Sequence, residues 1–308
     1  MNTPSTYPRD HLTVARCRPD FLASLSKDNI NWSEVEATVE IHSAGRSEAQ
    51  SIDQAATYTF YLLQARPDRI SVQGMWAGKT NMILIIASAA GIKTSPKLDI
   101  SNSSHVQLIH AFIKRLYDPH PSMIDPTIKR RKEKDSCVFD IAVHIESSGQ
   151  LETVQCNGYR ILTIGNSLHQ RSHNSHSPAR ICGNEIPIIK DQYVKKANRF
   201  TEAEILEHIH KEDVPGVVHC VHSETVQWEQ DREISSSERK KIRMCLVEYG
   251  RAFMDLETPL EALKAVYDLL ESESNSELDA SVDSIFNHFF LNSHPAFIPQ
   301  AQCITSGY

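Results

Sequence analysis

Alternating apolar and polar residues predict three strands in the first part of the chain. Apolar residues that recur every three to four positions predict two helices. ATVEIHS (37–43) alternates as a half-buried strand does. RISVQGMWAG (69–78) and NMILIIASAA (81–90) are two apolar strands joined by a short turn. Helical spacing covers 47–67 and 103–119, and a proline ends each pattern. This mixture predicts an α+β unit with helices packed on an antiparallel sheet.

Three local details of this first part are less regular. DFLASLSKD (20–28) predicts a weak helix, and either Ser103 or Ser104 is expected to cap the later helix. Residues 119–136 are rich in proline and basic residues and are expected to form a loop. Its basic run, IKRRKEKD (128–135), is interpreted as solvated rather than as a nuclear address or a phosphate-binding patch.

The second half shows the same two periodicities. A histidine-rich segment at 167–184 has neither period and is interpreted as a polar loop. The predicted strands are 137–146, 157–165, 185–194, 214–223 and 240–250, and the predicted helices are 198–212 and 258–273. Thr258 and Pro259 stand at the cap and first position of the last helix.

Composition fits an ordinary globular chain of two domains. The 308 residues carry a formal net charge of −7, so a general nucleic-acid coat is not expected. Seven scattered cysteines without a CxxC pair indicate reduced thiols and an intracellular protein, cytoplasmic or nuclear. No apolar run reaches the roughly 18 residues that a membrane helix needs, and no secretory signal is predicted. The expected division is 1–34 tail, 35–150 first unit, 151–273 second unit and 274–308 tail.

The order of the second unit resembles that of a protein-kinase N-lobe. IPIIKDQY (186–193) is followed by RFTEAEILEHI (199–209), by DVPGVVH (213–219) and by a strand that ends in EYG. Together with the upstream stretch 58–100, these motifs resemble the fungal-type protein kinase family over about residues 35–271. The resemblance implies an N-terminal α+β domain followed by a kinase-like N-lobe, with an antiparallel sheet and one main helix.

The resemblance also implies roles for single residues. Lys190 is the strand lysine that would contact nucleotide phosphates, and Glu202 is the helix glutamate that would pair with it. Glu204 is the alternative partner if the helix register differs. Glu248 and Tyr249 would lie in the hinge that contacts adenine through backbone groups. A solubilising strand-edge charge is the alternative interpretation of Lys190.

The chain departs from the kinase pattern at three points. No GxG occurs among its 11 glycines, and SLHQRSHNSHS (167–177) stands where the family has its glycine-rich loop. In that stretch Arg171 and the histidines are the groups that could meet an anion. No HRD-like or DFG-like stretch occurs in the 308 residues. ATP is therefore the one candidate cofactor, Mg²⁺ is not supported, and no catalytic residue is assigned.

These departures predict a truncated or degenerate kinase-like protein without phosphotransfer activity and with a regulatory or scaffolding role. One alternative is an active Ser/Thr-type kinase whose C-lobe is supplied by another chain or omitted by the gene boundary. The other is a protein-interaction module that binds no nucleotide. A protein partner is expected at the exposed face of the N-lobe, where a homodimer is one arrangement, whereas neither a membrane nor nucleic acid is an expected partner. An apolar stripe in the tail, at Val282, Ile285, Phe286, Phe289 and Phe290, would suit such a contact.

Two further groups of residues suggest a zinc site and a nuclease motif, and each has a plainer interpretation. His169, His173 and His176 would share a helical face suited to Zn²⁺, but the segment is polar, so no metal site is expected. Glu40 stands where the family often has a glutamate–x–lysine that resembles a nuclease motif, but Ile41 and His42 follow it here. Glu40 is therefore interpreted as a surface carboxylate.

Overall fold

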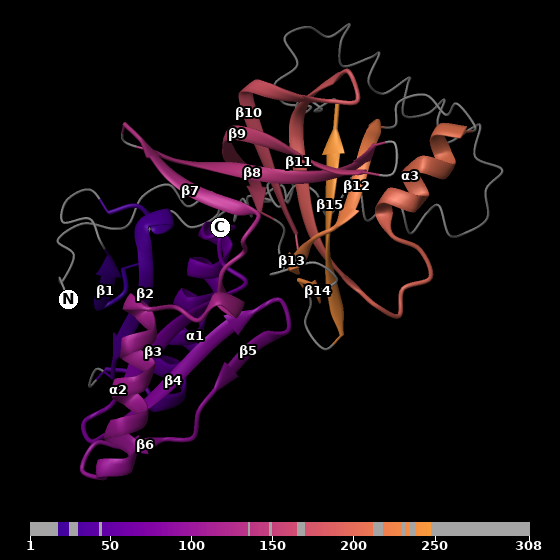
Figure 1. Cartoon of the computed structure of the whole chain (residues 1–308). Coiled ribbons are helices and arrows are strands. Elements are labelled where there is room, and N and C mark those ends of the chain that lie inside the picture. The colour runs from indigo at the N-terminus through magenta and orange to yellow at the C-terminus, as the bar shows by residue number, and fades with distance from the viewer. Residues whose placement is uncertain are drawn as a thin grey trace, which may run out of the picture.

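The computed structural model shows two large β-sheets that follow one another along the chain, and a separate two-stranded sheet (Figure 1). It describes residues 18–24, 30–42, 45–134, 136–147, 150–164, 170–211, 218–229, 232–234 and 238–247. The helix predicted at 258–273, the tail stripe, Glu248 and Tyr249 lie outside these residues. The mixed α+β class with a kinase-like N-lobe is confirmed.

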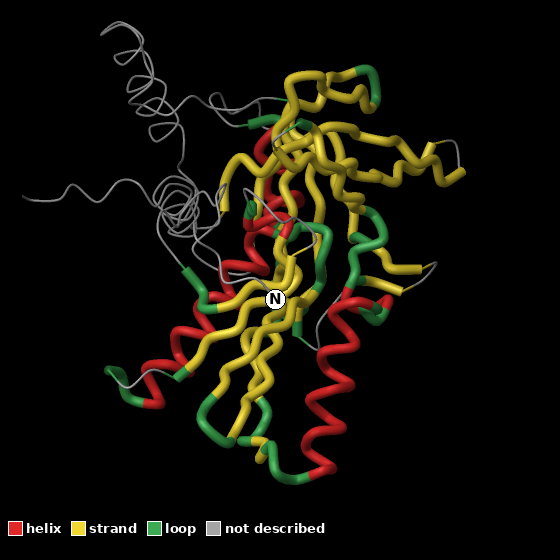
Figure 2. The backbone as a smooth tube through the Cα atoms, turned by 90° about the vertical axis from the view of Figure 1, so that its left-hand side faces the viewer, coloured by secondary structure: helices red, strands yellow, loops and turns green. Residues whose placement is uncertain are grey.

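The first sheet is a layer between two helices (Figure 2). Its strand order is β1-β2-β3-β4-β5, and β6 pairs with β4. The strands β2 and β3 are parallel because α1 connects them, whereas the other pairs are antiparallel. The elements are β1 (Phe21–Ser24), η1 (Trp32–Glu34), β2 (Val35–Ile41), α1 (Glu48–Ala65), β3 (Ser71–Ala77), β4 (Asn81–Ser88), β5 (Gly91–Thr94), β6 (Leu98–Asp99), α2 (Ser103–Tyr117) and η2 (Pro121–Met123).

The core of the first unit lies between α1 and the sheet. Leu62, Leu63 and Val72 pack there with the fully buried Trp32. Gly74 allows the close approach, because a Cβ at this position would lie 1.9 Å from Thr59 Oγ1. Gly74 therefore serves helix packing, and the stretch 74–80 belongs to a β-hairpin rather than a phosphate loop.

Two local predictions for the first unit are wrong. Residues 21–24 form strand β1, paired with β2, instead of a weak helix, because the sheet supplies partners that a short helix lacks. The cap of α2 is Asn102 rather than Ser103 or Ser104, since its side chain accepts hydrogen bonds from the N–H groups of Ser104 and His105.

The second sheet has the strand order β12-β15-β11-β10-β9-β8-β7. All of its pairings are antiparallel. It contains β7 and β8, whereas the expected division at residue 150 assigns them to the first unit. The elements are β7 (Ile128–Glu133), β8 (Ser136–Ser147), β9 (Gln150–Ile164), β10 (Gln170–Ile181), β11 (Asn184–Lys195), α3 (Glu202–Lys211), β12 (Cys220–Thr225) and β15 (Arg239–Leu246), with a separate pair β13 (Gln227–Glu229) and β14 (Arg232–Glu233).

Two segments that the sequence assigns to loops are strands. The basic run is strand β7, and its charges are paired: Arg130 with Glu36 at 3.0 Å and Lys132 with Glu34 at 2.7 Å. Much of the histidine-rich segment is strand β10, joined to β11 by a tight turn. In this turn Cys182 and Gly183 both have positive φ, as a two-residue type I′ hairpin requires. In β7 the polar sequence hides the strand period because partners in the first unit pair with Arg130 and Lys132.

Of the helices that the structure describes, none combines the length and apolar character needed to cross a membrane.

Candidate nucleotide-anchoring site

Strand β11 is central in the second sheet and directs successive side chains to opposite faces. Ile188 and Val194 pack toward α3, in a cluster with Ala203. Lys190 has the same orientation and meets Glu202, whereas Asp191 points to the opposite face. Both faces are buried, so this strand carries polar residues only where each has a partner.

Helix α3 begins where its own side chains favour it. The N–H of Glu204 donates to Thr201 Oγ1 at 3.3 Å, and Glu204 Oε2 accepts from the N–H of Thr201 at 2.6 Å. This reciprocal pair is a capping box. Glu204 is therefore engaged at the helix start, and the alternative pairing of Glu204 with Lys190 is wrong. Glu202 lies in the first turn, where the helix dipole favours its negative charge.

The structure brings Lys190 and Glu202 together. Lys190 Nζ lies 2.5 Å from Glu202 Oε1, and the two side chains are only 11% and 9% exposed. Gln192, two residues along the same face, donates from Nε2 to Glu202 Oε2 at 3.0 Å. Both oxygens of Glu202 are thus held from strand β11, so the lysine and the helix have a defined relative position.

The cysteine Cys220 lies beside this pair on β12. Its Sγ donates to the carbonyl of His222 at 3.3 Å, and burial raises the pKa of its thiol. A thiol with a raised pKa is a poor nucleophile, so Cys220 adds an apolar wall rather than a reactive group.

Arg171 and His173 do not lie on the face of the sheet that carries Lys190. In the β10–β11 register Arg171 stands opposite Asp191, and Ser172 stands opposite Lys190. Arg171 and His173 are both buried on the Asp191 face, and His173 packs its ring edge-on to Phe139. The expectation that these groups could meet an anion near Lys190 is therefore wrong, because strand alternation turns them to the other face. His169 lies outside the described residues.

The opposite face carries an ionic network that sequence reasoning missed. Asp191 receives hydrogen bonds from Arg243 Nε at 2.8 Å and Nη2 at 3.0 Å, and it lies 2.7 Å from Lys241 Nζ. Burial alone would raise the pKa of Asp191, but Arg243 and Lys241 overcome it and hold this pKa well below its usual range. The signal for it was the charged Lys241 and Arg243 alternating with apolar residues in β15.

Metal ligands do not gather in the part of the chain that is described. There, no three His, Cys, Asp or Glu side chains converge closely enough to hold an ion. The groups at Lys190 fit an anionic phosphate, for which a rigidly held ammonium is suited.

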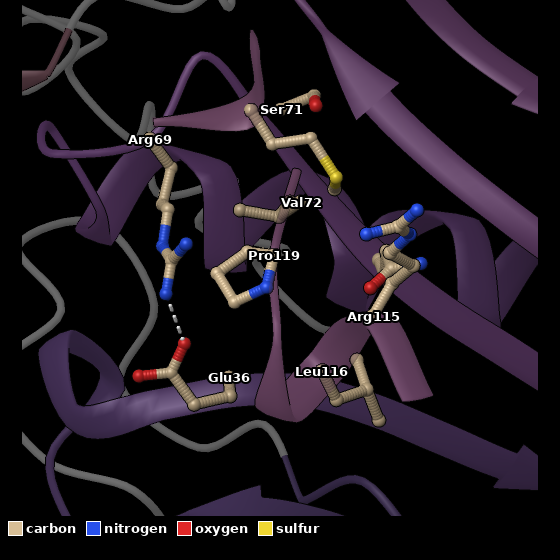
Figure 3. Close-up of a pocket in the computed structure, with 9 residues that line it drawn as sticks. Glu36, Arg69, Ser71, Val72, Arg115, Leu116 and Pro119 are labelled. Carbon is tan, nitrogen blue, oxygen red and sulfur yellow. Dashed lines mark hydrogen bonds and ion pairs between the residues drawn. The ribbon is translucent and has the colours of Figure 1, made fainter. Parts of the chain in front are cut away.

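A small hollow lies in the first unit, between strand β3 and the end of α2 (Figure 3). Its volume is about 10 Å³, room for one water molecule. Arg69 Nη2 and Glu36 Oε2 meet at its wall at 2.7 Å (Figure 3). None of its lining residues belongs to the second sheet, and it is far too small for a nucleotide.

Comparison with known proteins identifies the family. Residues 18–251 match the model of the fungal protein kinase family, which is more than half of the chain. No curated protein and no solved structure gives a significant match. The chain therefore belongs to the fungal protein kinase family, and it is a kinase-like protein.

Proposed function

We propose that this fungal protein kinase family member is a regulatory or scaffolding protein that binds an adenine nucleotide at Lys190 and does not itself transfer phosphate. The observation that carries this proposal is the 2.5 Å contact between Lys190 Nζ and Glu202 Oε1. A strand lysine held by a helix carboxylate is the arrangement that kinases use on nucleotide phosphates. Gln192 supports the same geometry from the next position on this face.

The transfer step requires groups that these 308 residues do not contain. The sequence has no GxG, no HRD-like stretch and no DFG-like stretch. Phosphoryl transfer depends on a base that accepts the substrate proton and on metal ions that neutralise the developing charge. We therefore expect binding without turnover, and a role exerted through the conformation of the lobe.

A titration with ATP tests the binding half of the proposal. We expect millimolar ATP to raise the melting temperature of the protein, and Lys190→Met to abolish that shift. Lys195→Met is the matched control, because Lys195 lies on the same strand but is exposed and should leave the shift unchanged. Repeating the titration with Mg²⁺ shows whether a metal contributes.

The transfer half needs a separate assay. Incubation with γ-labelled ATP and a generic protein substrate should give no label above that of the Lys190→Met variant. Labelling that depends on Lys190 would contradict the proposal and favour an active kinase. Unchanged melting at millimolar ATP would contradict nucleotide binding.

That second result would favour an interaction module, which one observation supports independently. Helix α2 exposes Val106 (44%), Leu108 (55%) and Tyr117 (81%) on the surface of the first unit. Val106 and Tyr117, eleven residues apart, share one side of this helix, whereas Leu108 lies on another, and exposed large apolar side chains on a shared face are a feature of protein-docking surfaces. A pull-down with Tyr117→Asp as the negative variant would test this alternative.

A further inference from the structure

The residue that follows the anchor lysine belongs to a second network, on the other face of the same strand. Asp191 stands directly opposite Arg243 in the β11–β15 register. Arg243 is fully buried and reaches beyond Asp191, because its Nη1 donates to Thr127 Oγ1 at 3.0 Å and to the carbonyl of Ala142 at 2.7 Å. The position of β11 is thus tied to strand β8 and to the segment that precedes β7.

This network continues into the connection between the two sheets. Lys241 Nζ lies 2.5 Å from Asp125 Oδ2 and 2.7 Å from Asp191 Oδ2, and it is buried with both. Asp125 Oδ1 accepts from the N–H of Thr127 at 2.9 Å. Lys241 therefore bridges two carboxylates, one on the anchor strand and one on the connection after η2.

The connection is in turn attached to the first unit. The N–H of Asp125 donates to the carbonyl of Asp68 at 3.0 Å, and the N–H of Ile70 donates to the carbonyl of Met123 at 2.9 Å. Asp68 is itself paired with Arg66 at 2.8 Å. An unbroken chain of hydrogen bonds and ion pairs therefore runs from the start of β3 to the residue beside Lys190.

Apolar side chains also pack between the first unit and the second sheet. Ala89 and Ile70 from the first unit cluster with Tyr193, Val226 and Ile234 from the second. Tyr193 lies on β11, two residues beyond Asp191 and on the same face. The first unit thus packs directly against the back of the anchor strand.

We propose that Asp125, Lys241 and Asp191 are positioning residues that couple the first unit to the Lys190–Glu202 pair. As a proposal about ligand affinity it rests on the proposed nucleotide binding. Successive residues of a strand are about 3.3 Å apart and share one rigid backbone, so a shift of Asp191 also moves Lys190. Because a buried ammonium requires its carboxylates, Lys241 cannot tolerate the separation of Asp125 from Asp191. The position of the first unit relative to the second sheet therefore determines where the ammonium group of Lys190 lies.

The test uses the full chain and the variant Asp125→Asn, which keeps the shape and the acceptor toward Thr127 but removes the charge facing Lys241. Asp118→Asn is the matched control, because Asp118 lies on the same connection, its side chain is 72% exposed, and its carboxylate lies 4.0 Å from Arg115. We expect Asp125→Asn to weaken ATP binding about five- to tenfold in calorimetric titration, in the range of measured couplings between sites. Asp118→Asn should bind as wild type does.

Hydrogen exchange supplies a second measurement that needs no nucleotide. In Asp125→Asn we expect the amides of 188–192 and of α3 to exchange about tenfold faster, a coupling of ordinary size, while those of α1 and β3 keep wild-type rates. Faster exchange throughout the chain would indicate general destabilisation and would overturn the proposal. Wild-type exchange at β11 together with wild-type ATP affinity would overturn it as well.

The two proposals fail differently. If wild type binds no ATP, the proposed function fails, and the exchange pattern alone decides whether the first unit controls β11. If Asp125→Asn does not fold, Thr127→Val keeps every charge and removes only the hydroxyl that meets Arg243 and Asp125. This milder variant should give a smaller change in exchange at the same amides, and wild-type rates there would overturn the coupling.

Discussion

Each sheet buries one carboxylate deeply, and the two behave in opposite ways. Asp191 in the second sheet is 5% exposed, and Glu40 in the first is 4% exposed. Asp191 has Arg243 and Lys241 within hydrogen-bonding distance, and its pKa is held well below its usual range despite burial. Burial, with the nearby Asp20, instead raises the pKa of Glu40 to about 7.

The two pKa values differ because the two carboxylates have different partners, since the exposed fractions of the two residues are nearly equal. Glu40 Oε2 has no hydrogen-bond partner among the described residues, and Arg46, which is half exposed, comes no closer to Glu40 than 3.6 Å. A buried charge is stable only when it is paired, and otherwise the group takes up a proton. The interpretation of Glu40 as a surface carboxylate is therefore wrong. The comparison separates a permanent ionic network in the second sheet from a titrating carboxyl in the first.

The largest effect is expected from breaking the paired side of the comparison. Arg243→Leu leaves Asp191 and Glu224 without their guanidinium, so we expect the free energy of unfolding in urea to fall by about 3–5 kcal/mol. Arg180→Leu, which removes a pair that is 72% and 59% exposed, should cost less than about 1 kcal/mol. A loss below about 1 kcal/mol for Arg243→Leu would show that the network is dispensable.

The titrating carboxyl of Glu40 is tested by changing the pH. The pKa of Glu40 in the folded state, about 7, lies above its ordinary 4.5, so the folded protein holds this proton more tightly than the unfolded chain. Stability is therefore lost as the pH rises from 4.5 to 7, by about 3 kcal/mol in total. Relative to wild type, Glu40→Gln should therefore gain about 2–3 kcal/mol of stability in urea unfolding when the pH is raised from 5 to 8. The exposed Glu146→Gln should keep the wild-type slope, and an unchanged slope in Glu40→Gln would refute the assignment.

A third prediction concerns His173, which is buried on the same face of the sheet as Asp191 and should make the fold sensitive to acid. Burial lowers the pKa of His173 to about 3, and neither ring nitrogen has a hydrogen-bond partner in the described ranges. This pKa is depressed from 6.5, so stability is lost as the pH falls below 6.5, by about 2 kcal/mol at pH 5. Relative to wild type, His173→Leu should therefore gain about 2 kcal/mol of stability when the pH is lowered from 7 to 5. The exposed His110→Leu should keep the same difference from wild type at both pH values.

The smallest effect on stability is expected at the anchor itself. Lys190→Met leaves Glu202 in the first turn of α3 with the amide of Gln192, so we expect a loss of about 1–2 kcal/mol in urea unfolding. A loss as large as that of Arg243→Leu would place Lys190 among the structural residues. A small loss combined with the loss of ATP binding would mark it as functional.

The pattern of apolar and polar residues was sufficient to predict strands and helices where the buried positions follow that pattern. The strands at 37–43, 69–78 and 81–90 and the helix at 47–67 were predicted close to their observed bounds, because an apolar stripe there meets the core. The prediction that Lys190 and Glu202 pair came from the family resemblance, and the contact is present. Their role toward a nucleotide stays a prediction.

What could not be predicted depends on contacts between distant parts of the chain. Arg130 and Glu36 are 94 residues apart, and Lys241 and Asp125 are 116 residues apart. Polar residues of this kind indicate a loop unless their partners are known, so β7 was not predicted. Strand β10 was not predicted because its own sequence is polar along most of its length. The Asp191 network was missed for the same reason as β7, since no local period links β11 to β15.

The contact between Lys241 and Asp125 also has a consequence for how such genes can recombine. A breakpoint at residue 150 would separate β7 and β8 from the sheet they belong to, and it would deliver Lys241 without its Asp125. A breakpoint in front of Asp125 keeps the opposite charges and the whole second sheet on one fragment. We therefore expect domain exchange within such a chain to begin in front of Asp125 rather than at residue 150.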